Sequence, residues 1–264
     1  MAQPRQQPSA AEQFAPDPGA EWEAGPRWVR VKFGGETIAD SKRVMLMREV
    51  GRLPVYYFPK EDVRTDLLEA SRHVTHNPGK GKATYWSVKV ADKVAEDAAW
   101  AYQSPGPEWP ALKDYVAFEW KKMAHWYEEE EEVFVHPRDP YKRIDTMPSS
   151  RHIRVVIDGV TVADSKRPHL LFETWLPNRY YLPQEDVNMA LLTPTETHSR
   201  CPYKGIASYW SVKVGDRTYK DIVWTYPDPI PECPKIKDLL CFFNEKVDLY
   251  VDGQLQERPK TKWS

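Results

Sequence analysis

One short polar motif, Asp-Ser-Lys-Arg, occurs twice in the chain, at residues 40–43 and 164–167. Asp and Ser side chains commonly cap free backbone amides in turns. An Arg is not needed for that purpose, and its planar guanidinium group donates two parallel hydrogen bonds to a carboxylate or an amide. The motif therefore predicts that Arg43 and Arg167 bind a ligand. The alternative is an ion pair within the protein, for which Glu49 is the candidate in the first copy.

Aromatic residues also recur in both halves of the chain, which has 11 Trp and 14 Tyr. Aromatic rings bury a large area of a ligand at a small entropic cost, and a ring face attracts cations. These rings predict an aromatic pocket in each half, and the alternative is that they are hydrophobic core. The candidate pocket residues are Tyr57, Tyr85, Trp86, Trp100 and Tyr102, repeated as Tyr181, Tyr209, Trp210, Trp224 and Tyr226.

Tyr85 and Trp86 open the string Tyr-Trp-Ser-Val-Lys-Val, which returns at residues 209–214. Neighbouring side chains of a strand point to opposite faces, so one ring of the two is expected in the pocket and the other in the core. Both assignments remain open. A Lys-Gly turn precedes each string, but without a glycine-rich approach and a following helix it is not a phosphate loop. Lys80 and Lys204 are therefore expected as single polar groups at the pocket rims.

Cys201 is the best candidate for a catalytic group. The neighbouring Arg200 and Lys204 are placed to lower the pKa of the thiol, and His198 is placed to act as its base. The first copy has Asn77 at the position of Cys201, so a catalytic thiol would serve one copy only. The alternative is an ordinary buried thiol. The seven His residues show no paired metal spacing within a copy, so we expect neither a metal nor another cofactor.

These candidates are positioned by an internal repeat with an offset of 124 residues, which predicts two copies of one domain. A run of five Glu at residues 128–132 lies between the copies and is expected to be solvated, while the apolar residues after it are able to add an edge strand. The predicted organisation is a disordered N-terminal tail at 1–25, a first domain at 26–126, an acidic and proline-rich linker at 127–150, and a second domain at 151–264.

Short strands joined by turns account for most of each copy. Residues 28–33 and 36–40 alternate in polarity around Gly34-Gly35, which predicts a β-hairpin that the second copy repeats around Asp158-Gly159. The chain has 24 Pro, and no stretch shows the apolar spacing of a long amphipathic helix. We therefore expect an all-β fold with two packed antiparallel sheets in each copy. Further strands of the first copy are expected at 45–50, 55–58, 83–90, 98–102 and 115–120.

Several linked motifs resemble the domain-of-unknown-function family 427. They are Val31-x-Phe33-Gly34-Gly35, Ala39-Asp40-Ser41-Lys42-Arg43, Tyr56-Tyr57-Phe58-Pro59 and Lys80-Gly81-x-x-x-Tyr85-Trp86, and close variants follow in the same order in the second copy. The resemblance implies a small all-β domain similar to the β-tent fold, in which two sheets share a pocket. Relatives of that fold, such as the thalidomide-binding domain of cereblon, hold a ligand in a cage of aromatic rings. Many β-tent proteins bind a zinc ion through four cysteines, and a chain with three cysteines is expected to lack it.

The bulk composition excludes some classes of partner. The formal net charge of −2 gives no basic field, so nucleic acid is not expected to bind. No run approaches the roughly 18 apolar residues that a membrane helix requires. The first residues lack the apolar segment of a signal peptide, and we expect a cytoplasmic protein with no membrane contact. Two fused copies form a pseudo-symmetric dimer within one chain, related by an internal pseudo-two-fold axis, so we expect the protein to be a monomer.

The sequence thus favours a binding module with one aromatic pocket in each domain, for a small molecule that is anionic or bears an amide. One alternative is an enzyme acting on a small metabolite, either through the thiol of Cys201 or through Asp40 and Arg43. Another is a protein-interaction scaffold that uses the acidic linker and the proline turns.

Overall fold

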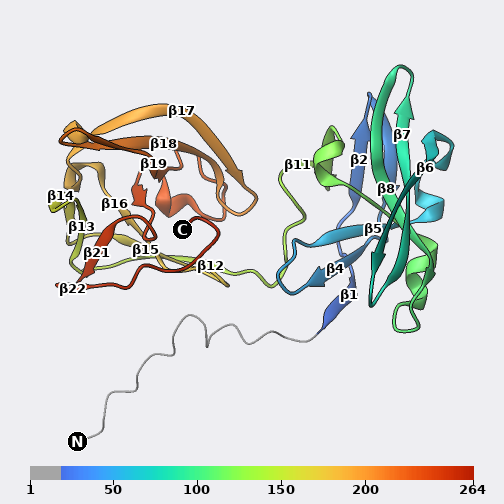
Figure 1. Cartoon of the computed structure of the whole chain (residues 1–264), viewed down its shortest axis with the longest axis horizontal. Helices are drawn as coiled ribbons and strands as arrows, with labels where there is room; N and C mark the ends of the chain where they lie inside the picture. The colour runs from blue at the N-terminus through green and yellow to red at the C-terminus, as the bar shows by residue number, and fades with distance from the viewer. Residues whose placement is uncertain (1–18) are drawn as a thin grey trace, which may run out of the picture. The chain divides into compact units, whose positions relative to one another are not determined.

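The computed structural model describes residues 19–264, and over that range it contains strands, turns and 3-10 helices of three to five residues. The chain forms two compact units, the first ending at Asp139 and the second beginning at Pro140 (Figure 1). Each unit contains one seven-stranded and one four-stranded sheet, and all strand pairs in the sheets are antiparallel. The prediction of an all-β fold with two sheets in each copy is confirmed.

The first unit carries the pattern that the second repeats. In its seven-stranded sheet the order is β1 (Ala20–Ala24), β4 (Met45–Glu49), β5 (Val55–Pro59), β9 (Tyr115–Phe118), β8 (Lys93–Pro105), β7 (Gly81–Val90) and β6 (Leu68–Asn77). In its four-stranded sheet the order is β11 (Glu131–Val133), β10 (His125–Glu128), β2 (Val29–Phe33) and β3 (Glu36–Ser41). Its 3-10 helices are η2 (Lys60–Asp62), η3 (Thr65–Leu67), η4 (Pro110–Asp114) and η5 (Trp120–Lys122).

The second unit has the same order, strand for strand. Its seven-stranded sheet runs β12 (Ile144–Pro148), β15 (His169–Glu173), β16 (Arg179–Leu182), β20 (Leu240–Phe242), β19 (Arg217–Thr225), β18 (Gly205–Val214) and β17 (Leu192–Cys201). Its four-stranded sheet runs β22 (Gln254–Leu255), β21 (Asp248–Val251), β13 (Ile153–Ile157) and β14 (Val160–Ser165). Its 3-10 helices are η6 (Gln184–Asp186), η7 (Met189–Leu191) and η8 (Pro234–Ile236).

Both predicted hairpins are confirmed, with the same turn geometry built from different residues. Gly34 and Gly35 have φ of 63° and 95°, and Asp158 and Gly159 have φ of 47° and 78°. Two successive residues with positive φ form the turn whose twist matches the strands of a hairpin, and Gly and Asp tolerate that conformation. The turns therefore fix the register of β2 with β3 and of β13 with β14.

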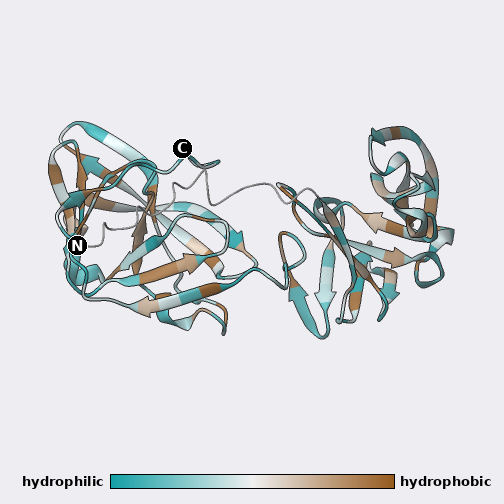
Figure 2. Cartoon of the chain, turned by 90° about the horizontal axis from the view of Figure 1, so that it is seen from below, coloured by the Kyte–Doolittle hydropathy of each residue, from teal (hydrophilic) through white to brown (hydrophobic). Residues whose placement is uncertain are grey.

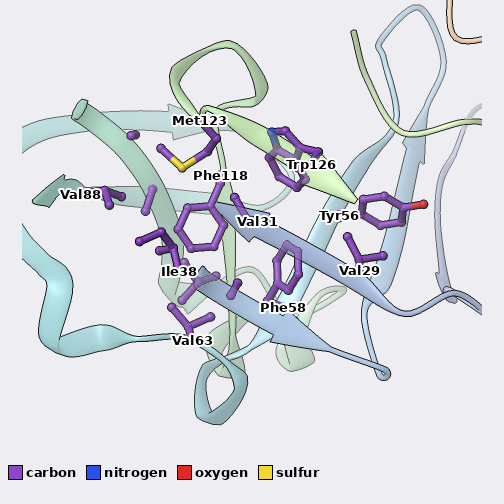
Figure 3. Close-up of a cluster of buried hydrophobic side chains, with 14 of the residues drawn as sticks. Val29, Val31, Ile38, Tyr56, Phe58, Val63, Val88, Phe118, Met123 and Trp126 are labelled. Atoms are coloured by element: carbon purple, nitrogen blue, oxygen red, sulfur yellow. The ribbon is translucent and has the colours of Figure 1, made fainter. Parts of the chain in front are cut away.

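The main core of the first unit lies between its two sheets. Figure 3 shows the rings of Phe58, Phe118 and Trp126 packed beside Val31 and Ile38. The ring centres of Phe58 and Phe118 are 5.7 Å apart, close to an edge-to-face arrangement. Hydrophobic and hydrophilic residues mix along the strands of both units (Figure 2). That mixing follows from strands whose alternate side chains face opposite ways.

The structure corrects the expected limits of the N-terminal tail and the linker. Residues 20–24 form β1, which pairs with β4, while residues 1–18 of the expected tail lie outside the described residues. The acidic run belongs to β10 and β11 at the edge of the four-stranded sheet. One of its carboxylates, Glu128, is buried and accepts a hydrogen bond from Tyr56 Oη at 2.9 Å, so the run is only partly a solvated surface. Among residues 19–264, no helix has the length and apolar character needed to cross a membrane.

Candidate functional site

The seven-stranded sheet of each unit buries aromatic residues on the face that points away from the four-stranded sheet. In β5, Tyr56 and Phe58 join the core between the sheets, whereas Tyr57 lies on the opposite face. We call this second surface of the first unit the first aromatic face. Its buried members are Met47, Tyr57, Ala83, Tyr102, Leu112 and Ala117, with the partly buried Trp22, Met45, Val55, Tyr85, Trp100, Trp109 and Tyr115 packed against them.

Three of the predicted pocket residues meet on the first aromatic face. Tyr85 and Trp100 are partners across β7 and β8, and their ring centres lie 6.2 Å apart in a stacked arrangement. Trp100 also meets Tyr57 edge to face at 6.3 Å. Trp22 of β1 packs against Tyr57 at 5.2 Å. Tyr85 and Trp100 remain partly exposed, so both rings are able to contact a ligand.

The second aromatic face is its counterpart in the other unit. Its buried members are Leu171, Tyr181, Ala207, Trp224, Tyr226, Cys233, Ile236 and Cys241, and Tyr209 packs against them. The rings of Tyr181 and Trp224 are perpendicular with centres 6.3 Å apart, and Trp224 Nε1 donates a hydrogen bond to Tyr181 Oη at 3.1 Å. Burial raises the pKa of Tyr181 well above its usual range, so this phenol stays neutral.

Each aromatic face contains a buried Lys paired with a Glu, and this Glu is buried in the second unit and partly exposed in the first. Lys80 Nζ lies 2.5 Å from Glu49 Oε2 and 3.4 Å from Met47 Sδ, and Lys80 is only 4% exposed. In the second unit, Lys204 Nζ lies 2.5 Å from Glu173 Oε2. The sequence predicted Lys80 and Lys204 as rim residues, and the structure places both inside the face with an acidic partner. A charge removed from water is costly unless it is paired, which is why each Lys has its Glu.

Arg43 and Arg167 have a different partner from the one that was expected. Arg43 Nη2 and Nε lie 2.7 and 3.3 Å from the two carboxylate oxygens of Asp62, which also accepts a hydrogen bond from Ser41 Oγ at 2.7 Å. Asp186 binds Arg167 and Ser165 in the same way. The structure does not bring either Arg together with the aromatic rings.

Trp86 and Trp210 lie on the other side of the sheet from Tyr85 and Tyr209. Both are partly buried and pack against the core between the sheets, so the structure does not bring Trp86 together with Trp100. The residue that follows each Trp has a local role, because Ser87 Oγ accepts a hydrogen bond from the amide of Asp97 at 3.2 Å. Asp97 has a φ of 49° beside an irregularity in the pairing of β7 with β8. This Ser therefore supports a bulge.

Cys201 is partly buried and packs against the second aromatic face, with Lys204 nearby, and no hydrogen bond joins it to the His198 proposed as its base among the described residues. His198 is exposed, and its Nδ1 lies 2.9 Å from the backbone oxygen of Glu196. Asp40 accepts a hydrogen bond from Trp28 Nε1 at 2.6 Å, whereas Arg43 pairs with Asp62. Within residues 19–264, no three His, Cys, Asp or Glu side chains gather closely enough to hold a metal ion.

A cavity of about 160 Å³ lies in the second unit, away from the second aromatic face. It includes none of the predicted site residues, and it is smaller than the roughly 300–1,000 Å³ of ordinary ligand pockets. The first aromatic face has the partly exposed rings of Tyr85 and Trp100, and the second has that of Tyr209, whereas Tyr181 and Trp224 are buried. The cavity is lined by Pro177, Asn178, Tyr180, Asn244, Leu249, Gln256, Glu257 and Pro259.

Comparison with known families gives one match, and it covers both units. The family described as a domain of unknown function (DUF427) matches residues 21–129 and again residues 145–253. No curated protein matches the chain. The matched ranges contain both aromatic faces with their Lys-Glu pairs. The chain belongs to the DUF427 family and contains two copies of its domain.

Proposed function

We propose that the chain is a small-molecule binding module whose ligands contact the aromatic faces. The observation that carries the proposal is a buried Lys paired with a Glu among Tyr and Trp rings, present in both units with the same separation along the chain. Ligand sites in proteins are mostly apolar and aromatic, with a few polar groups that orient the ligand. Each aromatic face has this composition.

The ion pair is a poor candidate for a purely structural element. A buried salt bridge contributes little net stability, because the cost of removing two charges from water offsets their attraction. Two apolar side chains of similar size would fill the same space at least as well. The presence of the pair in both units therefore supports a role in recognition.

The ion pairs also change which ligand charge we favour. The expectation of an anionic ligand relied on Arg43 and Arg167, and both guanidinium groups are bound by carboxylates. Lys80 and Lys204 are likewise paired with Glu. A ligand with hydrogen-bond donors, such as an amide or an amine, fits the remaining acceptors better than an anion.

Indole resonances provide a direct test. In the full chain labelled with ¹⁵N, the Nε1 signals of Trp100 and Trp224 should shift when a set of neutral and charged fragments is titrated. Trp120 and Trp126 serve as the internal control, because their rings are stacked 4.2 Å apart and pack with the core between the sheets. Fragments that shift the control signals and leave Trp100 and Trp224 unchanged would overturn the proposal.

A further inference from the structure

We infer that Glu49 in the first unit binds the ammonium group of a small-molecule ligand, at the position that the side chain of Lys142 occupies in the second unit. The inference rests on the proposed function and names the chemical class of the ligand. It also implies that the two units differ, with an open ammonium site in the first and one filled by the chain itself in the second.

The second unit shows how the shared carboxylate binds two ammonium groups. Glu173 Oε2 lies 2.5 Å from Lys204 Nζ, and its Oε1 lies 2.9 Å from Lys142 Nζ. The Glu173 side chain is 4% exposed as a result. Lys142 Nζ also lies 5.1 Å from the ring centre of Tyr203, within the range of a cation–π contact. The second unit therefore already holds an ammonium group between a carboxylate and an aromatic ring. The first unit shares the carboxylate but has Gly79 at the position of Tyr203.

The first unit has the same carboxylate without the second lysine. Glu49 Oε2 binds Lys80, whereas no residue between 19 and 264 forms an ion pair with Glu49 Oε1. The Glu49 side chain remains 22% exposed. Ala20 pairs with Glu49 as Ile144 pairs with Glu173, which agrees with the 124-residue offset of the repeat. In sequence, that offset aligns Lys142 with a proline, which has no side-chain amino group.

The surroundings of Glu49 suit a primary ammonium group. A carboxylate has two oxygens that each accept a charge-assisted hydrogen bond. Burial and the nearby Glu49 carboxylate raise the pKa of Tyr102 to about 12, so its hydroxyl stays neutral beside the site. Arg52 lies next to Glu49, because its backbone amide donates to the backbone oxygen of Glu49, but its side chain is exposed and forms no ion pair with Glu49 among the described residues. Its positive charge weakens cation binding without pairing with Glu49.

The test uses n-butylammonium, because the lysine side chain beyond Cα is a butylammonium group. The full chain labelled with ¹⁵N is titrated with n-butylammonium, with neutral 1-butanol and with butyrate, and the indole signal of Trp100 is followed. We expect n-butylammonium to bind about tenfold more tightly than 1-butanol, since its hydrogen bond to a carboxylate is charge-assisted. Butyrate should bind most weakly. Equal affinity for n-butylammonium and 1-butanol, or tighter binding of butyrate, overturns the inference.

Two substitutions sharpen the test. Glu49→Gln should remove the preference for n-butylammonium over 1-butanol. Lys142→Met should free Glu173 Oε1, so that the indole of Trp224 also responds to n-butylammonium. This gain does not depend on the folding of the Glu49 variant. The matched control is Lys32→Met, which removes an ammonium group 5.3 Å from the Tyr127 ring and should change neither signal.

The outcomes separate this inference from the proposed function. If 1-butanol or butyrate binds as tightly as n-butylammonium when the Trp100 signal is followed, the ammonium site is wrong and the binding face stands. If Lys142→Met leaves Trp224 unresponsive, the equivalence of the two units is wrong and the inference fails. If neither the three probes nor the fragment set moves Trp100 or Trp224, both proposals fail.

Discussion

Lys204 Nζ lies 2.5 Å from Glu173 Oε2 in the second unit, and both side chains are buried. Removing one charge of such a pair leaves the other buried without compensation. We therefore expect Glu173→Gln to lower the free energy of unfolding by about 3–5 kcal/mol. Urea denaturation of the variant measures this loss.

The matched control for this prediction is the double substitution Glu173→Leu with Lys204→Met. It removes both buried charges and fills the space with apolar groups, while the partly exposed Lys142 is able to extend into water. The stability of this variant should therefore be close to that of the original chain. A double variant as unstable as Glu173→Gln would show that the ion pair itself stabilises the fold.

The same pair contributes to how stability depends on pH. Burial opposes ionisation of Glu173, but Lys204 and Lys142 outweigh it and lower the pKa of this carboxyl below its usual 4.5. Burial likewise opposes the charge on Lys204, yet the Glu173 carboxylate raises the pKa of this ammonium group above 10.5. Because folding lowers the pKa of its carboxyl group, Glu173 stabilises the fold above pH 4.5, and this contribution is lost as the pH falls. Because folding raises the pKa of its ammonium group, Lys204 stabilises the fold below pH 10.5, and this contribution is lost as the pH rises.

We therefore expect a plateau of stability between about pH 4.5 and 10.5, with a decline on each side. Urea midpoints measured from pH 3 to 11 test this profile. In the double variant Glu173→Leu with Lys204→Met, both declines should become shallower. A profile that is unchanged in the double variant would mean that other groups determine it.

Asp62 connects two segments of the first unit, and we expect its role to be structural. Its carboxylate accepts hydrogen bonds from Ser41 and Arg43. Asp62→Ala would leave the Ser41 hydroxyl, in a residue only 2% exposed, without its acceptor. The expected loss in free energy of unfolding is about 1–3 kcal/mol. The Trp100 indole should respond to ligands as before, and loss of that response in a folded variant would contradict a structural role.

Much of the fold could be predicted, because the sequence patterns that indicate it involve neighbouring residues or occur in both copies. The hairpin turns at Gly34-Gly35 and Asp158-Gly159 depend on adjacent residues, and the repeat tests each strand twice. Strands β6 and β17 gave no such signal. Both are edge strands with mostly exposed, polar residues, so they lack the apolar alternation that marks a half-buried strand.

The side-chain partners could not be predicted, because they join residues that are distant in sequence. Glu49 and Lys80 are 31 positions apart, in β4 and in the turn before β7. Arg43 and Asp62 belong to two motifs that the sequence repeats together, and that joint repetition is the signal that could have suggested their contact. Trp22 had no such signal, because the second copy has Thr146 at its position.

Trp86 and Trp100 lie on opposite faces of one sheet, so we expect replacement of Trp86 to reduce mainly stability and replacement of Trp100 to reduce mainly ligand binding. Trp86 packs against the core between the sheets, whereas Trp100 lies on the first aromatic face. We expect Trp86→Ala to lower the free energy of unfolding by about 3 kcal/mol, the lower end for such a truncation, because the ring is only partly buried. The folded fraction should still bind ligands. Trp100→Ala should instead abolish binding at the first aromatic face, at a smaller cost in stability.

Urea denaturation combined with ligand titration of both variants distinguishes these roles. For Trp100→Ala, binding is followed through the side-chain methyl signals of Met45 and Met47, which belong to the same face. Trp224→Ala provides a second comparison, since it alters the other unit and should leave the Met45 and Met47 signals responsive. A Trp100→Ala chain that binds normally would remove this ring from the site, because Tyr57 and Tyr85 would then suffice.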